Sequence, residues 1–184
     1  YKYLFLEDKD FWYSLKISLF FSGFTVVTEF GLGLLIALLF NRRNTGKRLW
    51  MSFLIIPMVI TPSIVSLIWK LMLNTEYGVL NYLLSLLSIG KINWLGYENA
   101  LWSLILVDIW EWTPFMALIL YAGLQALPQE PYEAALVDGA SSVQLFRFIT
   151  LPLMRPIIFI SLLLRAIDSL KMFDIVYGLT QGGP

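Results

Sequence analysis

Three acidic side chains stand inside long apolar stretches of this sequence. Glu29 lies in one stretch, and Asp108 and Glu111 lie three residues apart in another, beside Trp110 and Trp112. Carboxylates at this spacing share a helical face, where they can take part in acid–base chemistry, bind a cation or hydrogen-bond a hydroxylated solute. Tryptophan beside them suits a sugar ring, because indole stacks on the apolar face of the ring while carboxylates bind its hydroxyls. These five residues are candidates for lining a solute path.

A structural role is the alternative for each acid. Glu29 can be hydrogen-bonded inside a helix contact, and Asp108 and Glu111 can pair with Lys or Arg of a neighbouring helix. The residues around Glu29 are small or polar at spacings of three and four, which places them on one helical face that we expect to pack on protein. The members of this face are Ser18, Ser22, Thr25, Glu29, Gly33 and Ala37. The sequence leaves both roles open.

The composition excludes several classes of protein. The 184 residues are 58% hydrophobic and only 14% charged, with a mean hydropathy of +0.72, whereas soluble domains are about 45–50% apolar and about 25% charged. Thirteen basic and 13 acidic residues give no net charge, which argues against a nucleic-acid partner. Cysteine and histidine are absent, so Ser-His-Asp and Cys-His catalysis and Cys/His metal sites are excluded. We expect an integral membrane protein with no catalytic residue and no metal site.

Four apolar stretches are long enough to cross a membrane, since a spanning helix needs about 20 mostly apolar residues. The three acids lie in two of them. An eleven-residue apolar run, 79–89, is too short to span and is expected to form a helix at the outer interface or over the bundle. Pro57 and Pro62 mark kinks without implying a function. The four predicted spans are residues 15–40, 49–73, 100–124 and 151–170.

The segment 41–48, which reads NRRNTGKR, sets the expected orientation. It carries four basic residues and no acid, so the positive-inside rule places it in the cytoplasm. Alternation then puts residues 74–99 and both ends outside, and 125–150 inside. The chain starts at Tyr1 rather than Met, shows no signal peptide, and stops after a loop-like run. We expect it to be part of a longer chain.

Residues 128–150 predict two short helices joined by a tight turn. Pro131 suits the first turn of a helix, and Gly139 suits the position just after its end. Ser141 followed by Gln144 is typical of a capping box for a second helix, which runs into the fourth span with Pro152 at the join. Such an elbow is either a rigid surface projection or a turn without a partner.

The same segment resembles the EAA motif of permease subunits of binding-protein-dependent ABC importers. The match is Glu133-Ala134-Ala135, then Gly139, then Ile149 through Pro152, without gaps. The resemblance implies a coupling helix that docks into a groove of a cytoplasmic ATPase. It further implies that Glu133 makes the polar contact, that Ala134 and Ala135 allow close approach and that Gly139 forms the turn. The implied coupling residues are Glu133, Ala134, Ala135, Asp138, Gly139, Ile149, Leu151 and Pro152.

The resemblance extends over most of the chain, which is similar to permeases of carbohydrate importers. The closing run, Leu179 through Pro184, resembles the first permease of glycerol-3-phosphate, lactose and maltose systems. This implies a single permease domain of the type I importer class, all-α and polytopic, lacking a leading and a closing core span. It implies a second, different permease subunit, two ATPase subunits and an extracytoplasmic solute-binding protein. It also implies a bacterial or archaeal cytoplasmic membrane, with its lipid, as the location.

Two other functions compete with a transport subunit. An intramembrane hydrolase or transferase would use Asp108 and Glu111, and an ion-coupled transporter would use Glu29 and Asp108. The missing histidine and cysteine weaken the first, and the elbow has no purpose in the second. Because no GxxxxGK[ST] loop is present, we expect no cofactor on this chain, with ATP and Mg²⁺ bound by the partner ATPase subunits. The same machinery could import another small solute.

Overall fold

The computed structural model describes residues 8–41 and 47–182, and every regular element in these ranges is a helix. Three of them are long and apolar enough to cross a membrane, or four if one bent pair counts as a single span. The predicted all-α class is confirmed for the described residues. In chain order the elements are α2 (Lys9–Asn41), α3 (Lys47–Val59), α4 (Pro62–Met72), α5 (Val79–Leu86), α6 (Ala100–Gln125), α7 (Glu130–Val137), α8 (Ser142–Leu145), the π-helix η1 (Phe146–Thr150), α9 (Leu151–Leu170) and α10 (Asp174–Thr180).

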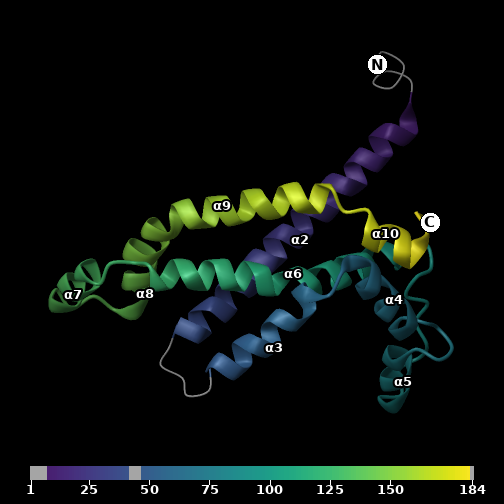
Figure 1. Ribbon diagram of the computed structural model, residues 1–184, viewed down its shortest axis with the longest axis horizontal. Helices are drawn as coiled ribbons and strands as arrows, with labels where there is room; N and C mark the ends of the chain where they lie inside the picture. The colour runs from purple at the N-terminus through teal and green to yellow at the C-terminus, as the bar shows by residue number, and fades with distance from the viewer. Residues whose placement is uncertain (1–7, 42–46, 183–184) are drawn as a thin grey trace.

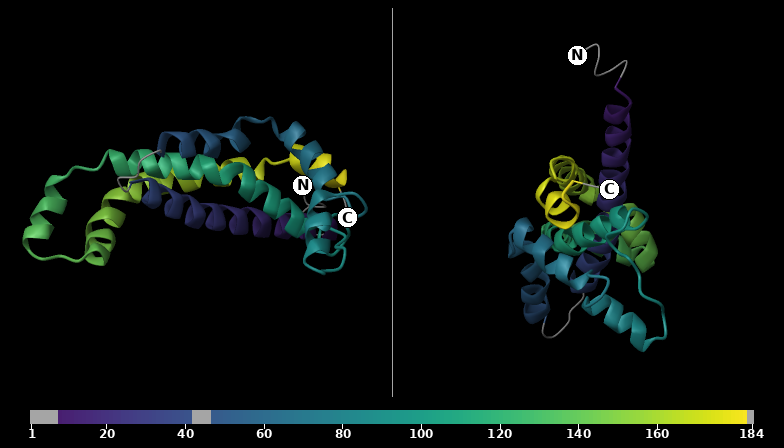
Figure 2. Two further views of the ribbon diagram at one scale, coloured as in Figure 1. Left: turned by 90° about the horizontal axis from the view of Figure 1, so that it is seen from below. Right: turned by 90° about the vertical axis from the view of Figure 1, so that its right-hand side faces the viewer.

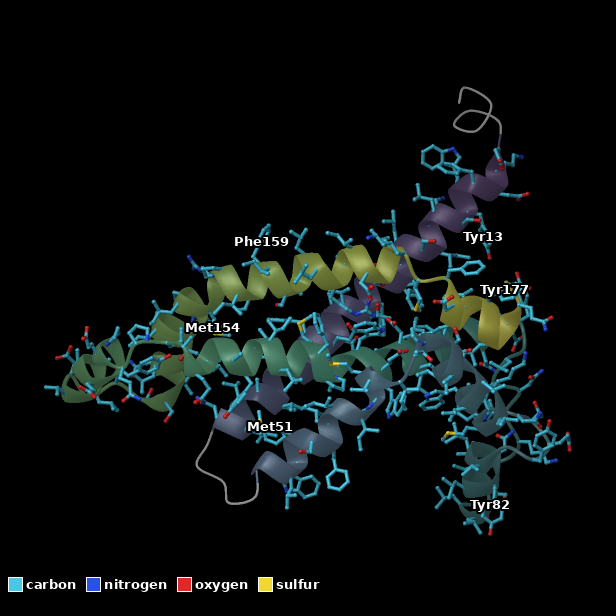
Figure 3. The ribbon with its side chains drawn as sticks, viewed as in Figure 1. Tyr13, Met51, Tyr82, Met154, Phe159 and Tyr177 are labelled. Atoms are coloured by element: carbon cyan, nitrogen blue, oxygen red, sulfur yellow. The ribbon has the colours of Figure 1, made fainter. Side chains whose placement is uncertain are left out.

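Helix α6 is the centre of the bundle and packs against α2, α3, α9 and α10 (Figure 1). Two apolar clusters lie along it. One joins α6 to α4 and α10 and includes Val65, Val107 and Leu179. The other joins α6 to α2 and α9 through Met116 and Met154. Figure 3 labels Met154 on α9, and also Phe159, whose side chain is exposed on the same helix.

The predicted spans coincide with helices except at the second. Residues 15–40 fall within α2, 100–124 within α6, and 151–170 form α9, which continues back through η1 and α8. Residues 49–73 form two helices that meet at 95°. The residue before a proline avoids the helical region, and Thr61, before Pro62, is extended with φ −65° and ψ 140°. The proline therefore ends one helix and starts the next.

Asn41 and Gln125, which begin the two segments expected on one side of the membrane, lie at the same end of the bundle. Gln125 Nε2 donates a hydrogen bond of 2.6 Å to Asn41 Oδ1, which brings the end of α6 to the end of α2. Helices α7 and α8 lie at one end of the molecule, and α4, α5 and α10 lie at the other (Figures 1 and 2). Most of the basic segment, residues 42–46, lies outside the described residues, so its cytoplasmic location stays a prediction.

The segment between α4 and α6, which is expected on the outer side, is fixed by one buried amide. Asn81 on α5 donates to the carbonyls of Thr75 (3.0 Å) and Ile92 (2.9 Å), and its oxygen accepts from Ile92 N and Trp94 Nε1. Every donor of this side chain is thereby satisfied. The predicted helix over 79–89 exists but ends at Leu86, earlier than expected.

Helix α10 was not expected, because its sequence reads as a loop. It packs on α4, where Gly178 meets Ser66 so closely that a Cβ at 178 would collide with the serine side chain. Lys70 Nζ also donates to the carbonyl of Gly178 at 3.4 Å. The absence of a side chain at 178 is what lets the two helices touch.

The small and polar face of α2 packs on protein, as predicted, over most of its length. Ser22, Thr25, Glu29, Gly33 and Ala37 are buried, whereas Ser18 is exposed. A Cβ on Gly33 would lie 2.8 Å from Met116 Cγ of α6, so the small residue allows close approach there. The prediction was wrong at Ser18, because α2 extends beyond the bundle at its N-terminal end (Figure 1).

Candidate functional site

A buried ionic cluster joins the three long helices. Glu29 of α2, Asp108 and Glu111 of α6, and Arg165 of α9 are each at most 1% exposed. Figure 3 shows polar side chains gathered where α2, α6 and α9 come together. Three elements far apart in sequence therefore meet at one charged centre inside an otherwise apolar bundle.

Arg165 organises the cluster. Its Nε donates to Glu29 Oε2 at 2.7 Å and its Nη2 to Glu29 Oε1 at 2.9 Å, a two-pronged pairing that the planar guanidinium favours. Nη2 also donates to Asp108 Oδ2, and Nη1 reaches Asp168 Oδ2 at 3.4 Å. The guanidinium carbon lies 5.1 Å from the ring centroid of Trp112, within range of a cation–π contact.

Sequence reasoning missed Arg165, which lies within the fourth predicted span, as a site residue. A guanidinium in an apolar helix is costly unless it meets carboxylates, so it was the natural partner for Glu29 and Asp108. Arg165 is therefore the cation with which these two acids pair, as their structural role requires. The arrangement does not test whether they also line a solute path, and that role stays a prediction.

Three buried polar atoms in this region lack a hydrogen-bond partner among the described residues. They are Asp108 Oδ1, Glu111 Oε2 and Thr113 Oγ1. Glu111 lies close enough to Asp108, Arg165 and Asp168 to interact with their charges, but no hydrogen bond from Arg165 reaches it. The cluster is therefore incomplete at Glu111, which makes this the least structural of the three acids.

Trp110 and Trp112 lie at separate places. Trp110 contacts Trp69 with ring centroids 5.4 Å apart and lines an apolar cavity of about 320 Å³ with Thr113 and Pro114. Trp112 lines a cavity of about 110 Å³ together with Asp168, Lys171 and Phe173. Residues two apart on a helix point in nearly opposite directions, so the two tryptophans are not the walls of one site.

Among the described residues, no group of three or more His, Cys, Asp or Glu side chains is arranged to hold a metal ion. The charged centre is built around a guanidinium instead. It can order helices or hydrogen-bond a polar solute.

The implied coupling residues form an elbow at one end of the bundle. No residue of α7 is buried, and Glu133 and Ala134 are exposed while Ala135 is half-buried. Helix α7 ends in a Schellman motif, in which Ala140 N donates to Ala135 O at 2.9 Å and Gly139 N donates to Leu136 O at 3.1 Å. Gly139 has φ +78°, the left-handed conformation expected for it.

The second half of the elbow leads into α9. The predicted capping box is present, because Ser141 N donates to Gln144 Oε1 at 2.7 Å and Gln144 N donates to Ser141 Oγ at 3.4 Å. The chain then forms η1, which contains Ile149, before Leu151 and Pro152 begin α9. Asp138 lies exposed at the end of α7.

The π-helix was missed, although Pro152 carried a signal for it. A proline ring clashes with the carbonyl four residues earlier, here that of Phe148 in η1. Widening the turn just before Pro152 relieves that clash, and π turns inside longer helices are frequent at functional sites.

The chain matches a known protein family. Residues 29–184 match the family described as binding-protein-dependent transport system inner membrane component. The chain is 45% identical over 180 residues to the trehalose/maltose transport system permease protein MalF of Thermococcus litoralis, covering 97% of this chain and 61% of that protein. It spans about three fifths of the length of the curated relatives it matches.

Solved structures agree with this match. The chain is similar to a bacterial ABC transporter involved in the import of the acidic polysaccharide alginate, with a TM-score of 0.84 and 26% identity, over 95% of this chain and 63% of the other. It is also similar to a bacterial alginate ABC transporter in complex with an alginate pentasaccharide-bound periplasmic protein, with a TM-score of 0.78 and 25% identity, over 94% and 64%. The expected permease fold is confirmed.

Proposed function

The chain belongs to the inner-membrane components of binding-protein-dependent transport systems, and from this membership we propose that it is a permease subunit of an ATP-driven sugar importer. The solute is a sugar or a sugar-like molecule, handed over by a binding protein on the outer side. A multi-pass membrane chain with an exposed elbow at one end and a polar centre among its spans suits this task. We place it in the cytoplasmic membrane of a bacterium or archaeon.

The observation that carries the proposal is the continuity between the elbow and the polar centre. From Ser142 to Leu170 the chain is one unbroken helical run of 29 residues. This run starts at the elbow and carries Arg165, which binds Glu29 and Asp108 on two other helices. A force applied at the elbow can therefore reach the centre of the bundle along one continuous helical run.

The partners follow from the same assignment. A second permease subunit would complete the pathway, and two ATPase subunits would bind ATP and Mg²⁺ and move the elbow. An extracytoplasmic binding protein would deliver the solute. One of the similar structures contains a saccharide-bound periplasmic protein, which supports a partner of that class.

Reversing the charge of Glu133 is expected to detach the ATPase. Glu133 is exposed on the elbow, so Glu133→Lys turns an attractive contact with an ATPase cation into a repulsive one. Mispaired interface charges cost about 2 kcal/mol or more, which weakens association roughly 30-fold. The measurement is co-purification of the ATPase with the tagged permease, together with solute uptake.

The matched control is Glu98→Lys, because Glu98 is an exposed acid just before α6, at the opposite end of the bundle from the elbow. It should retain the ATPase. Equal retention in both variants would rule out the assignment of Glu133 as the polar contact.

The solute path is proposed to pass Glu111 and Trp112. One carboxylate oxygen of Glu111 has no hydrogen-bond partner among the described residues, and Trp112 lines a cavity together with Asp168 and Phe173. An indole beside carboxylates and a second aromatic ring is suited to a sugar. Similar chains named for trehalose and maltose support this solute class.

Glu111→Gln and Trp112→Leu are expected to raise the solute concentration for half-maximal uptake by roughly tenfold each, equivalent to ~1.4 kcal/mol of lost binding. Transport assays in proteoliposomes with a panel of disaccharides would measure this, with complex assembly as the internal check. Trp102→Leu, ten residues earlier on α6, is the control because Trp102 packs on Phe20 and Phe24 instead. Normal uptake by Glu111→Gln and Trp112→Leu would show that Glu111 and Trp112 do not bind the solute.

A further inference from the structure

The first turn of α7 is tied to the beginning of α9 by a hydrogen bond between two side chains. Tyr132 Oη lies 2.9 Å from Thr150 Oγ1, although the two residues are 18 positions apart. Thr150 is the last residue of η1 and is only 8% exposed. The bond bypasses the whole elbow and joins its first helix directly to the long helix that follows.

The direction of this bond follows from the chemistry of a hydroxyl, which has one proton to donate. Thr150 Oγ1 donates that proton to the carbonyl oxygen of Leu145, at 3.3 Å. Both bonds form together only when the phenol of Tyr132 donates to Thr150. The result is a chain of two hydrogen bonds that runs from α7 through Thr150 to the end of α8, across the widened turn of η1.

The bond matters because α7 has little other support from the spans. A cavity of about 360 Å³ lies between α7 and the ends of α2 and α6, lined by residues that include Leu38, Gln125, Leu136 and both members of the bond. No residue of α7 is buried. A push on α7 therefore meets open space in the direction of α2 and α6, and a direct link in the direction of α9.

We propose that Tyr132 and Thr150 are positioning residues whose hydrogen bond makes α7 and α9 move as one body. The inference rests on the proposed coupling function, because it concerns how movement of the elbow reaches the spans. With the bond in place, displacement of α7 tilts α9 and shifts Arg165 against its carboxylate partners. Without it, the same displacement is absorbed by the Gly139 turn and by η1.

The test uses the complete importer with its ATPase and binding-protein partners in proteoliposomes. Tyr132→Phe keeps the ring and removes the donor, and Thr150→Val removes the acceptor. Each should lower the solute transported per ATP hydrolysed by about fivefold, the effect of one hydrogen bond on an equilibrium. The double variant should be no worse than either single one, because both remove the same bond.

Two control variants separate this role from general damage. Thr150→Ser keeps the hydroxyl and should transport as much solute per ATP hydrolysed as the parent protein. Tyr97→Phe removes a phenol from an exposed position in the outer segment, where Tyr97 is 78% exposed, and should have no effect. A loss in Thr150→Ser equal to that in Thr150→Val would overturn the proposal.

A distance measurement reports the link directly. The chain has no cysteine, so spin labels can be placed at two engineered cysteines, Val137→Cys on α7 and Leu163→Cys on α9, both exposed positions. The distance distribution should be narrow in the parent protein and broad in Tyr132→Phe. If Glu133→Lys detaches the ATPase while Tyr132→Phe changes neither the transport ratio nor the distribution, the link is refuted and the function stands. If the parent protein retains no ATPase and takes up no sugar in proteoliposomes, the proposed function itself fails.

Discussion

Arg165→Gln is expected to deplete the folded protein in the membrane. The substitution leaves the carboxylates of Glu29 and Asp108 buried without their cation, since both are completely buried and bind Arg165. Breaking one side of a buried ion pair costs about 3–5 kcal/mol, a large part of the stability of a typical domain. The measurement is the yield of monodisperse protein in detergent and its thermal unfolding midpoint.

Two further variants show that the charge balance is the cause. Arg155→Gln, at an exposed position on the same helix, should behave like the parent protein. Adding Glu29→Gln and Asp108→Asn to Arg165→Gln should recover much of the lost yield, because neutral side chains are less costly to bury than unpaired charges. Equal yields for Arg165→Gln and Arg155→Gln would contradict a stabilising role for the cluster.

Gly139→Val is expected to abolish ATP-driven uptake while the permease remains inserted. Gly139 sits at φ +78°, and a residue with a Cβ loses about 1–2 kcal/mol in that conformation. The elbow would then be populated about 5–30-fold less, and a β-branched side chain is especially unfavourable there. Solute-stimulated ATP hydrolysis by the reconstituted complex is the readout.

Space is not the obstacle at this turn, because no atom of the described residues lies within 4 Å of the place that a Cβ on Gly139 would occupy. The backbone conformation alone therefore disfavours a side chain. Gly139→Asn should keep most activity, since asparagine tolerates the left-handed region. Similar losses for Val and Asn would show that bulk, and not conformation, is what the turn excludes.

Local signals explain why the elbow could be predicted. The capping pair Ser141 and Gln144 and the turn residue Gly139 act within a few residues of themselves, so their types and spacing were enough. The buried face of α2 was predictable for the same reason, since Gly33 and Ala37 follow helical spacing. These patterns need no knowledge of distant parts of the chain.

The features that could not be predicted depend on distant residues. Nothing local to Arg165 indicates that Glu29, on another helix, would bind it. Pro62 indicates a break in the second span, but neither the 95° angle of that break nor the packing of α10 on α4 can be derived from nearby residues. The divergence of Trp110 and Trp112 follows from their two-residue spacing on the predicted helix, but the cavity that each one lines depends on distant elements.

The contact between Gly178 and Ser66 restricts how this chain can diverge in evolution. Any residue other than glycine at 178 would collide with the serine side chain, so position 178 cannot change first without separating α10 from α4. Glycine at 66 has to come before or together with a side chain at 178, because a Cβ at 66 would itself lie 2.5 Å from the new Cβ. Positions 66 and 178 are therefore expected to change together, although one precedes α6 in the sequence and the other follows it.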